Sequence, residues 1–215
     1  MAIRNVISRF LSHPRVYRLQ RRMLGGNRLE ERLAPYTALA VQERPTGTVV
    51  DVGGGTGRSR SLWPDAWSYV SIDPDERAVH FGQVGAGTER AVGDASDLPF
   101  PDGFADAVLL KDVSHHLDGE RWEKTLSEVH RVLKSDGYLV FLDGVWSPGR
   151  WVSRLAWRLD VGMYPRKATE IENAIAVHFD VSAVERFSAI HDCVMMLARP
   201  RVKPSAPMIV GAMGN

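Results

Sequence analysis

A glycine-rich stretch with an acidic residue at its head is the part of the sequence best suited to bind a ligand. The β-branched run from Thr48 to Val50 ends at Asp51. The glycines that follow are Gly53, Gly54, Gly55 and Gly57. Glycine accepts positive φ angles and lets the backbone approach a ligand closely, and a helix start after such a turn presents unpaired N–H groups. We therefore predict a ligand-binding turn between a buried strand and a helix.

The spacing of these glycines excludes two common phosphate-binding turns. A dinucleotide-binding turn needs G-x-G-x-x-G, but Arg58 occupies the sixth position counted from Gly53. Counted from Gly55, that position is Arg60. A P-loop needs four residues between its glycines, whereas three separate Gly53 from Gly57. The remaining pattern is acidic-x-G-x-G-x-G, and its carboxylate would repel a pyrophosphate.

Two adjacent histidines are the candidates for proton transfer. His115, His116 and Asp112 follow the apolar run 104–110, and open α/β sheets bind ligands beyond the carboxyl ends of their strands. Histidine has an ordinary pKa near neutrality, which suits a general base. Neighbouring residues on a helix diverge by about 100°, so both cannot face one reacting group. Asp112 and His116 could share a helix face, but no third ligand has metal-site spacing, so we predict no metal.

Four further motifs follow the glycine turn in order. Short acidic motifs end the second predicted strand and follow the third: Asp73 with Pro74, and Gly93, Asp94 and Ala95. A strand with the two histidines covers 108–117, and a helix-turn-strand pattern covers 126–142. Together with Asp51 and the glycines, this ordered series resembles the class I S-adenosylmethionine-dependent methyltransferases, especially the group that acts on small molecules.

The resemblance implies that S-adenosylmethionine is the cofactor and S-adenosylhomocysteine the product. It implies that Asp73 accepts hydrogen bonds from the ribose hydroxyls and that Asp94 meets the adenine amino group. The implied cofactor-binding residues are Asp51, Gly53, Gly55, Gly57, Asp73, Pro74, Asp94, Ala95 and Lys111. The catalytic candidates are His116, which the resemblance favours as the base, His115 and Asp112.

We expect the acceptor to be a small molecule, methylated on a hydroxyl of a natural product, a lipid or a sugar-like compound. One alternative is C- or N-methylation of a hydrophobic quinone or lipid, which needs no histidine base. An alternative of another class is a non-catalytic, cofactor-binding partner subunit.

The elements that must position these residues alternate between strands and helices. Apolar runs predict strands at 48–51, 69–72, 89–92, 104–110, 138–142, 179–188 and 192–198. Helices are predicted at 28–42 and 119–134, with a short one at 58–63 that Pro64 ends. Repeated β-α units imply a doubly wound, mostly parallel seven-stranded α/β sheet. The last two strands are separated by only a few residues, so they must be antiparallel to each other.

Composition and charge predict one domain with an appended arm. The 215 residues are 44% hydrophobic and 25% charged, an ordinary globular mixture. We divide the chain into a helical arm or cap (1–44, with two further short helices within 3–24), a cofactor-binding domain (45–200) and a flexible tail (201–215). Residues 1–32 hold eight arginines against two glutamates. The arm either gates the site or dimerises.

Residues 145–168 interrupt the strand-helix rhythm and are predicted to form a lid-like insertion. Aromatic and basic residues alternate there: Trp146, Arg150, Trp151, Arg154, Trp157, Arg158, Tyr164, Arg166 and Lys167. This mixture suits a hydrophobic or anionic acceptor or contact with a membrane surface. It favours, over these, a helix packed on the core with a solvated basic face. The formal net charge of +1 argues against nucleic acid as a partner. One cysteine and no long apolar stretch favour the cytoplasm.

Overall fold

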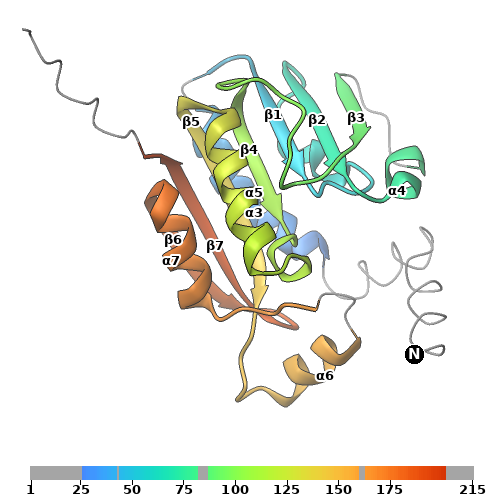
Figure 1. Ribbon diagram of the computed structural model, residues 1–215, viewed down its shortest axis with the longest axis vertical. Coiled ribbons are helices and arrows are strands. Elements are labelled where there is room, and N and C mark those ends of the chain that lie inside the picture. The colour runs from blue at the N-terminus through green and yellow to red at the C-terminus, as the bar shows by residue number, and fades with distance from the viewer. Residues whose placement is uncertain (1–25, 43, 82–86, 160–162, 202–215) are drawn as a thin grey trace, which may run out of the picture.

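The computed structural model of the chain describes residues 26–42, 44–81, 87–159 and 163–201. Its strands are β1 (Gly47–Val52), β2 (Trp67–Asp73), β3 (Thr88–Val92), β4 (Ala105–Lys111), β5 (Leu133–Val145), β6 (Phe179–Ser188) and β7 (Asp192–Pro200). They form one sheet in the order β3-β2-β1-β4-β5-β7-β6 (Figure 1). Strands β1 to β5 pair with one another in parallel, whereas β7 is antiparallel to both β5 and β6. The predicted fold class is therefore confirmed.

Helices cover both faces of this sheet. They are α3 (Gly26–Val41), α4 (Glu76–Phe81), α5 (Gly119–Val132), α6 (Trp151–Leu159) and α7 (Ala168–His178), with 3-10 turns η1 (Arg58–Leu62) and η2 (Ser114–His116). Because side chains alternate along a strand, Val50 packs in the cluster of α5 and α7, while Val49 packs in the cluster of α3 and η1. Helix α6 stands away from the sheet, beyond the carboxyl end of β5 (Figure 1).

The amphipathic helix α5 shows how the sequence pattern builds the core. Asp118 caps its amino end by accepting a hydrogen bond of 2.9 Å from the backbone N–H of Arg121. Trp122, Leu126 and Val129 recur at helical spacing and are buried against the sheet. Each such side chain contributes about 2 kcal/mol of hydrophobic stabilisation. This packing holds α5 against the sheet.

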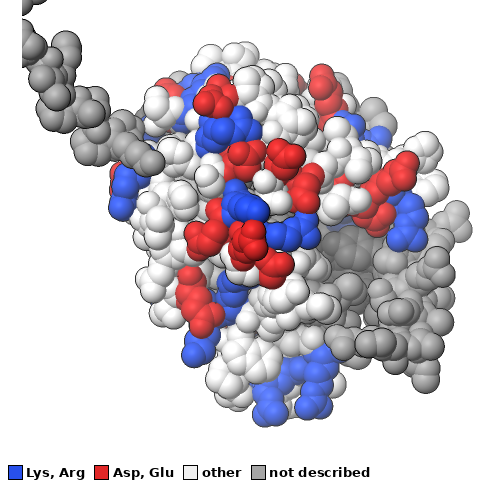
Figure 2. Space-filling model, viewed as in Figure 1, with Lys and Arg blue, Asp and Glu red and all other residues white. Residues whose placement is uncertain are grey.

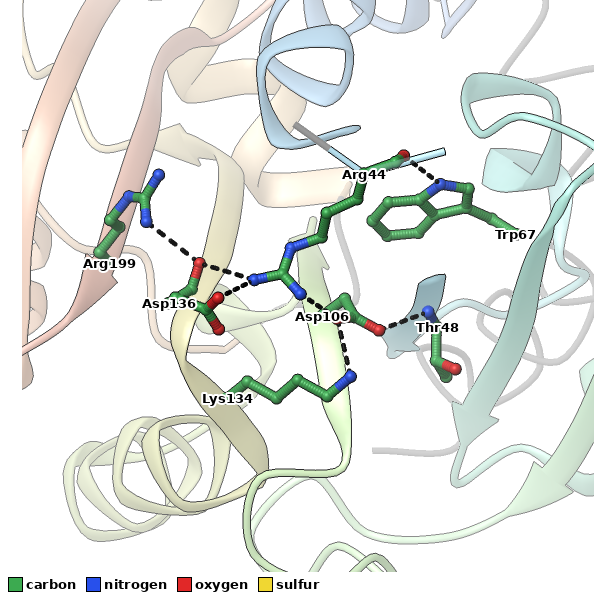
Figure 3. A network of polar contacts seen from close by, with 7 residues as sticks. All are labelled: Arg44, Thr48, Trp67, Asp106, Lys134, Asp136 and Arg199. Atoms are coloured by element: carbon green, nitrogen blue, oxygen red, sulfur yellow. Dashed lines mark hydrogen bonds and ion pairs between the residues drawn. The ribbon is translucent and has the colours of Figure 1, made fainter. Parts of the chain in front are cut away.

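A polar network ties the amino-terminal ends of the strands together, opposite the glycine turn (Figure 3). The buried Asp106 carboxylate accepts hydrogen bonds from Arg44 (2.6 Å), Lys134 (2.8 Å) and the backbone N–H of Thr48 (2.9 Å). Arg44 also forms an ion pair with Asp136. Burial alone would raise the pKa of Asp106, but the hydrogen bonds from Lys134 and Thr48 and the charge of Arg44 outweigh it and hold that pKa below its ordinary value.

The predicted elements are confirmed for all seven strands and for the helices at 28–42 and 119–134, within a few residues at their ends. Strand β5 is longer than the predicted 138–142, because Leu133 already pairs with Ala105 and a register shift accommodates the turn at 135–137. The short helix before Pro64 is the 3-10 turn η1. Helices α4 and α7 have no counterpart among the predicted elements, and α6 lies within 145–168, where a helix with a solvated basic face was one of the interpretations.

Parts of the predicted domain division lie outside the described residues, namely the helices within 3–24 and the tail beyond residue 201. No helix in the described part of the chain is long and apolar enough to cross a membrane.

Candidate functional site

The glycine turn at the carboxyl end of β1 has a backbone that only glycine can adopt without strain. Gly53, Gly55 and Gly57 have φ angles of 72°, 55° and 73°. A Cβ atom on Gly53 would lie 2.5 Å from Val113 Cγ2, and one on Gly54 would lie 2.3 Å from the Oγ of Ser71. The glycines thus allow the turn to pack directly on β2 and on the residues after β4.

The acidic residue at the head of this turn is buried beneath it. The Asp51 carboxylate is 1% exposed and accepts a hydrogen bond from the Tyr69 hydroxyl. Burial raises the pKa of Asp51 to about 6, against the Tyr69 hydrogen bond and the charge of Lys111, which both lower it. The carboxylate thus lies inside the protein, close to Gly54, and is not exposed at the surface of the turn. Lys111, a predicted cofactor contact, lies with its Nζ 3.6 Å from Glu30 Oε1 of α3.

Asp73 connects the glycine turn to the end of β2. Its Oδ2 accepts a hydrogen bond of 2.8 Å from the backbone N–H of Gly55, and its Oδ1 accepts one of 2.8 Å from the backbone N–H of Asp75. Burial raises the pKa of Asp73, although these two backbone hydrogen bonds lower it. Each carboxylate oxygen can accept a second hydrogen bond, so Asp73 retains acceptor capacity for a ligand hydroxyl. Pro74 follows it directly.

Asp94, beyond β3, is held by two partners. Its Oδ1 accepts hydrogen bonds from the backbone N–H (2.9 Å) and the hydroxyl (2.8 Å) of Ser96, and its Oδ2 accepts one from Arg121 (2.5 Å). Burial alone would raise the pKa of Asp94, but these partners outweigh it and lower that pKa. The adjacent Ala95 is buried. The sequence contains no signal for the contact with Arg121, because α5 brings that residue from a distant part of the chain.

The histidine turn, residues 112–116, lies at the same edge of the sheet because β4 neighbours β1. Asp112 has a φ angle of 59° and is the one non-glycine residue with positive φ in the described ranges. Strained backbone of this kind clusters at functional sites. His115 is buried, whereas His116 is exposed, and their ring centroids are 4.1 Å apart. We expected that the two histidines would not face the same reacting group, and in the structure one is buried and the other exposed.

Asp143, near the end of β5, is a residue that the sequence analysis missed. Its fully buried carboxylate accepts hydrogen bonds from His115 Nδ1 (2.6 Å) and from Ser114, through both its backbone N–H (2.7 Å) and its hydroxyl (2.6 Å). The Gly144 N–H donates a further bond of 2.7 Å. An acidic residue directly after the apolar run 138–142 was the available signal. Asp143 fixes the orientation of the His115 ring and the path of the histidine turn.

The predicted lid-like segment packs against the histidine turn. Tyr164 donates a backbone hydrogen bond of 3.0 Å to the carbonyl of His115, and Arg166 donates to the carbonyls of Leu117 (2.8 Å) and Ser114. The Trp157 ring of α6 meets the His115 ring edge-on at 5.4 Å. The segment thus borders the site. No group of side chains in the described residues could hold a metal ion.

Comparisons with known proteins agree with this geometry. Residues 50–141 match the family described as "Methyltransferase domain". An uncharacterized methyltransferase of Mycobacterium sp. (strain KMS) is 37% identical over 112 residues, which are 50% of this chain and 43% of that protein. A fatty-acid O-methyltransferase of Mycolicibacterium smegmatis is 36% identical over 115 residues, which are 50% of this chain and 41% of that protein. The chain thus spans less than half the length of these relatives.

Solved structures share the fold. A SAM-dependent methyltransferase from Methanosarcina mazei superimposes with a TM-score of 0.65 at 17% identity, covering 74% of this chain and 95% of that one. A geranyl diphosphate methyltransferase, in complex with GPP and sinefungin, superimposes with a TM-score of 0.61 at 18% identity, covering 72% and 71%. Residues 50–141 thus match a methyltransferase domain, and the seven-stranded sheet has the fold of methyltransferases of known structure.

Proposed function

We propose that the chain transfers a methyl group from S-adenosylmethionine to a hydroxyl of a small-molecule acceptor. The observation that carries the proposal is the meeting, at one edge of the sheet, of the glycine turn with the histidine turn, where Val113 packs against Gly53. The glycine turn can bind a ligand through its backbone N–H groups, and the histidine turn has side chains that can accept a proton. A fatty-acid O-methyltransferase among the relatives supports oxygen as the acceptor atom.

The residues of this edge fit the cofactor. Gly53 and Gly54 pack so closely on Val113 and Ser71 that a Cβ atom would clash with them. The carboxylates of Asp73 and Asp94 lie at the ends of neighbouring strands. We assign the methionine end to the glycine turn, the ribose hydroxyls to Asp73 and the adenine to Asp94 and Ala95. The bound cofactor supplies a methyl group that its sulfonium makes electrophilic.

The chain's own residues orient the acceptor and remove its proton. We assign the base to His116, because its exposed ring can reach an acceptor while His115 is buried and bonded to Asp143. His116 accepts the hydroxyl proton as the new C–O bond forms and the C–S bond breaks. Asp143 and His115 hold the histidine turn in place, and the Trp157 ring and the Tyr164 backbone contact it at His115.

The test begins with cofactor binding and continues with one substitution. Thermal-shift measurements with S-adenosylmethionine, S-adenosylhomocysteine, NADH and ATP should show stabilisation by the first two alone, by about 2.7 kcal/mol at 100 times the dissociation constant. A panel of fatty acids, phenols and prenylated alcohols with a labelled methyl donor then identifies an acceptor. Binding without turnover on any acceptor would favour the non-catalytic partner subunit.

With an acceptor in hand, His116→Ala should lower kcat by about 100-fold or more and leave the cofactor dissociation constant unchanged. His116→Gln is the matched control for lost hydrogen bonding, because it retains a polar side chain and lacks a basic nitrogen. A fall of less than about threefold in kcat would reject the histidine base and favour C- or N-methylation.

A further inference from the structure

Helix α6, together with Met163 and Tyr164, carries an unusual concentration of exposed apolar side chains. Of the ten large hydrophobic residues that are exposed among the described residues, five lie between positions 151 and 164. They are Trp151 (74% exposed), Val152, Leu155 (51% exposed), Met163 and Tyr164. Such a patch on a soluble surface marks a place of contact with another body.

Basic residues flank this apolar surface in a regular way. Trp151 and Leu155 are four residues apart and so lie on one line along the helix, and Arg154 and Arg158 form an adjacent line. The four side chains surround a shallow groove of about 240 Å³. No acidic residue occurs within α6. In Figure 2, basic side chains without acidic neighbours appear at the lower end of the molecule, where Figure 1 places this helix.

The opposite side of the helix faces the candidate site. Ser153 and Trp157 are buried, and the Trp157 ring lies against both His115 (5.4 Å between centroids) and His191 (4.3 Å). Helix α6 therefore has one face on the histidine turn and the other in solvent. Whatever binds the outer face comes within one helix diameter of the proposed methyl-transfer site.

We propose that α6 is an interfacial helix that docks the protein on a lipid surface containing anionic lipids. Tryptophan and leucine insert favourably at the boundary between headgroups and acyl chains, and arginine contributes through its attraction to anionic headgroups. A polar protein partner would require charge complementarity alone and would leave Trp151 and Leu155 without a reason to be exposed together. That a lipid acceptor reaches the site from this surface rests on the proposed function; the docking itself does not.

The experiment is cosedimentation of the full chain with vesicles of phosphatidylcholine alone or mixed with phosphatidylglycerol, at low and high salt. We expect binding to the mixed vesicles that weakens with salt. Arg154→Gln/Arg158→Gln should weaken the partition coefficient for mixed vesicles by about 30-fold, and Trp151→Ser/Leu155→Ser by about tenfold or more. Matched controls are Lys124→Gln on α5 and Val177→Ser on α7, whose side chains are also exposed. Both should bind as the unchanged protein does.

Several outcomes overturn the docking. They are no vesicle binding, equal binding to both vesicle types, and binding unaffected by the α6 substitutions in variants whose melting temperatures match the unchanged protein. A dimer that the Trp151→Ser/Leu155→Ser substitutions dissociate, without vesicle binding, would assign the patch to a second copy of the chain. Because vesicle binding needs no acceptor, binding without methyl transfer rejects the proposed function only, and transfer to a soluble acceptor without binding rejects the docking only.

Discussion

Gly53 offers a quantitative test of the glycine turn, because two separate physical costs meet there. Its φ angle of 72° disfavours any side chain, and a Cβ atom would lie 2.5 Å from Val113 Cγ2. Left-handed backbone costs about 1 kcal/mol for alanine, and overpacking a buried contact costs about 1–3 kcal/mol. Gly53→Ala should therefore lower the free energy of unfolding by about 3 kcal/mol and weaken cofactor binding, because the turn must shift.

Gly103 separates the two costs. Its φ angle of 63° is similar, but a Cβ atom there would meet nothing within 4 Å. Gly103→Ala should thus lower the free energy of unfolding by about 1 kcal/mol, the backbone cost alone, and leave cofactor binding unchanged.

A double-mutant cycle with Val113→Ala isolates the steric cost. Val113→Ala alone leaves a small cavity and should cost about 2 kcal/mol. The double variant Gly53→Ala/Val113→Ala should be more stable than the sum of the single changes predicts by about 1–2 kcal/mol, because the clashing methyl group is gone. Urea unfolding followed by tryptophan fluorescence measures all four proteins. Additive losses, or a loss at Gly53 no larger than at Gly103, would refute the assignment of the turn to direct contact with Val113.

Two further predictions concern buried carboxylates. Asp106→Ala should lower the free energy of unfolding by about 3 kcal/mol at pH 7, because Arg44 and Lys134 lose a buried partner, whereas the exposed Asp136→Ala should change it by less than about 1 kcal/mol. The pKa of Asp106 is lowered by folding, so its stabilisation is present above about pH 4 and is lost as the pH falls through the folded-state value. Urea titrations from pH 7 down to pH 3 should show the difference between the Asp106→Ala variant and the unchanged protein shrinking, and a constant difference would contradict the account. The opposite sign applies to Asp51, whose pKa folding raises to about 6: its contribution destabilises the protein as the pH rises from about 4 to about 6. Asp51→Asn should remove about 2–3 kcal/mol of that loss. If the free energy of unfolding of the variant and of the unchanged protein changed equally between pH 4 and pH 7, the Asp51 carboxylate would be ionised throughout that range.

The strands could be predicted because the pattern of apolar and polar residues in each strand reflects how deeply the strand is buried. Every residue from 105 to 110 is buried in β4, and the corresponding apolar run is uninterrupted except at Asp106. Edge strand β6 instead alternates between partly buried and exposed positions after its buried first residue, Phe179. The strand ends could be predicted because acidic residues such as Asp51 and Asp73 lie at the carboxyl ends of the strands, next to the candidate site.

The missed helices carry weaker or misleading patterns. Helix α6, whose bounds were not predicted, is amphipathic. Large apolar side chains lie on both its buried and its exposed faces, Trp157 on one and Trp151 on the other, so the pattern does not indicate which face packs on the protein. Helix α7 buries Ile171 and Ile175, and small or polar residues fill much of the rest. In both cases the tertiary environment decides the structure.

Only the parts of the site that are formed by local backbone motifs could be predicted from the sequence. The glycine turn is a local feature, and so its position could be predicted from spacing. Partners such as Asp143 for His115 and Arg121 for Asp94 join residues separated by 28 and 27 positions, and only the packing of the sheet brings them together. The roles of the individual site residues remain predictions for the experiments above.

Helix α3 bears on whether the predicted arm can gate the site. Near its start, Glu30 lies 3.6 Å from Lys111 at the carboxyl edge of the sheet, and shortly after its end Arg44 bonds to Asp106 at the amino edge. Between these points Leu33 is completely buried. Moving α3 as a lid would expose that side chain and break both polar contacts, at a cost of several kcal/mol. We therefore assign α3 to the fixed frame of the domain, and a gating role for the predicted arm applies only to the residues that precede this helix.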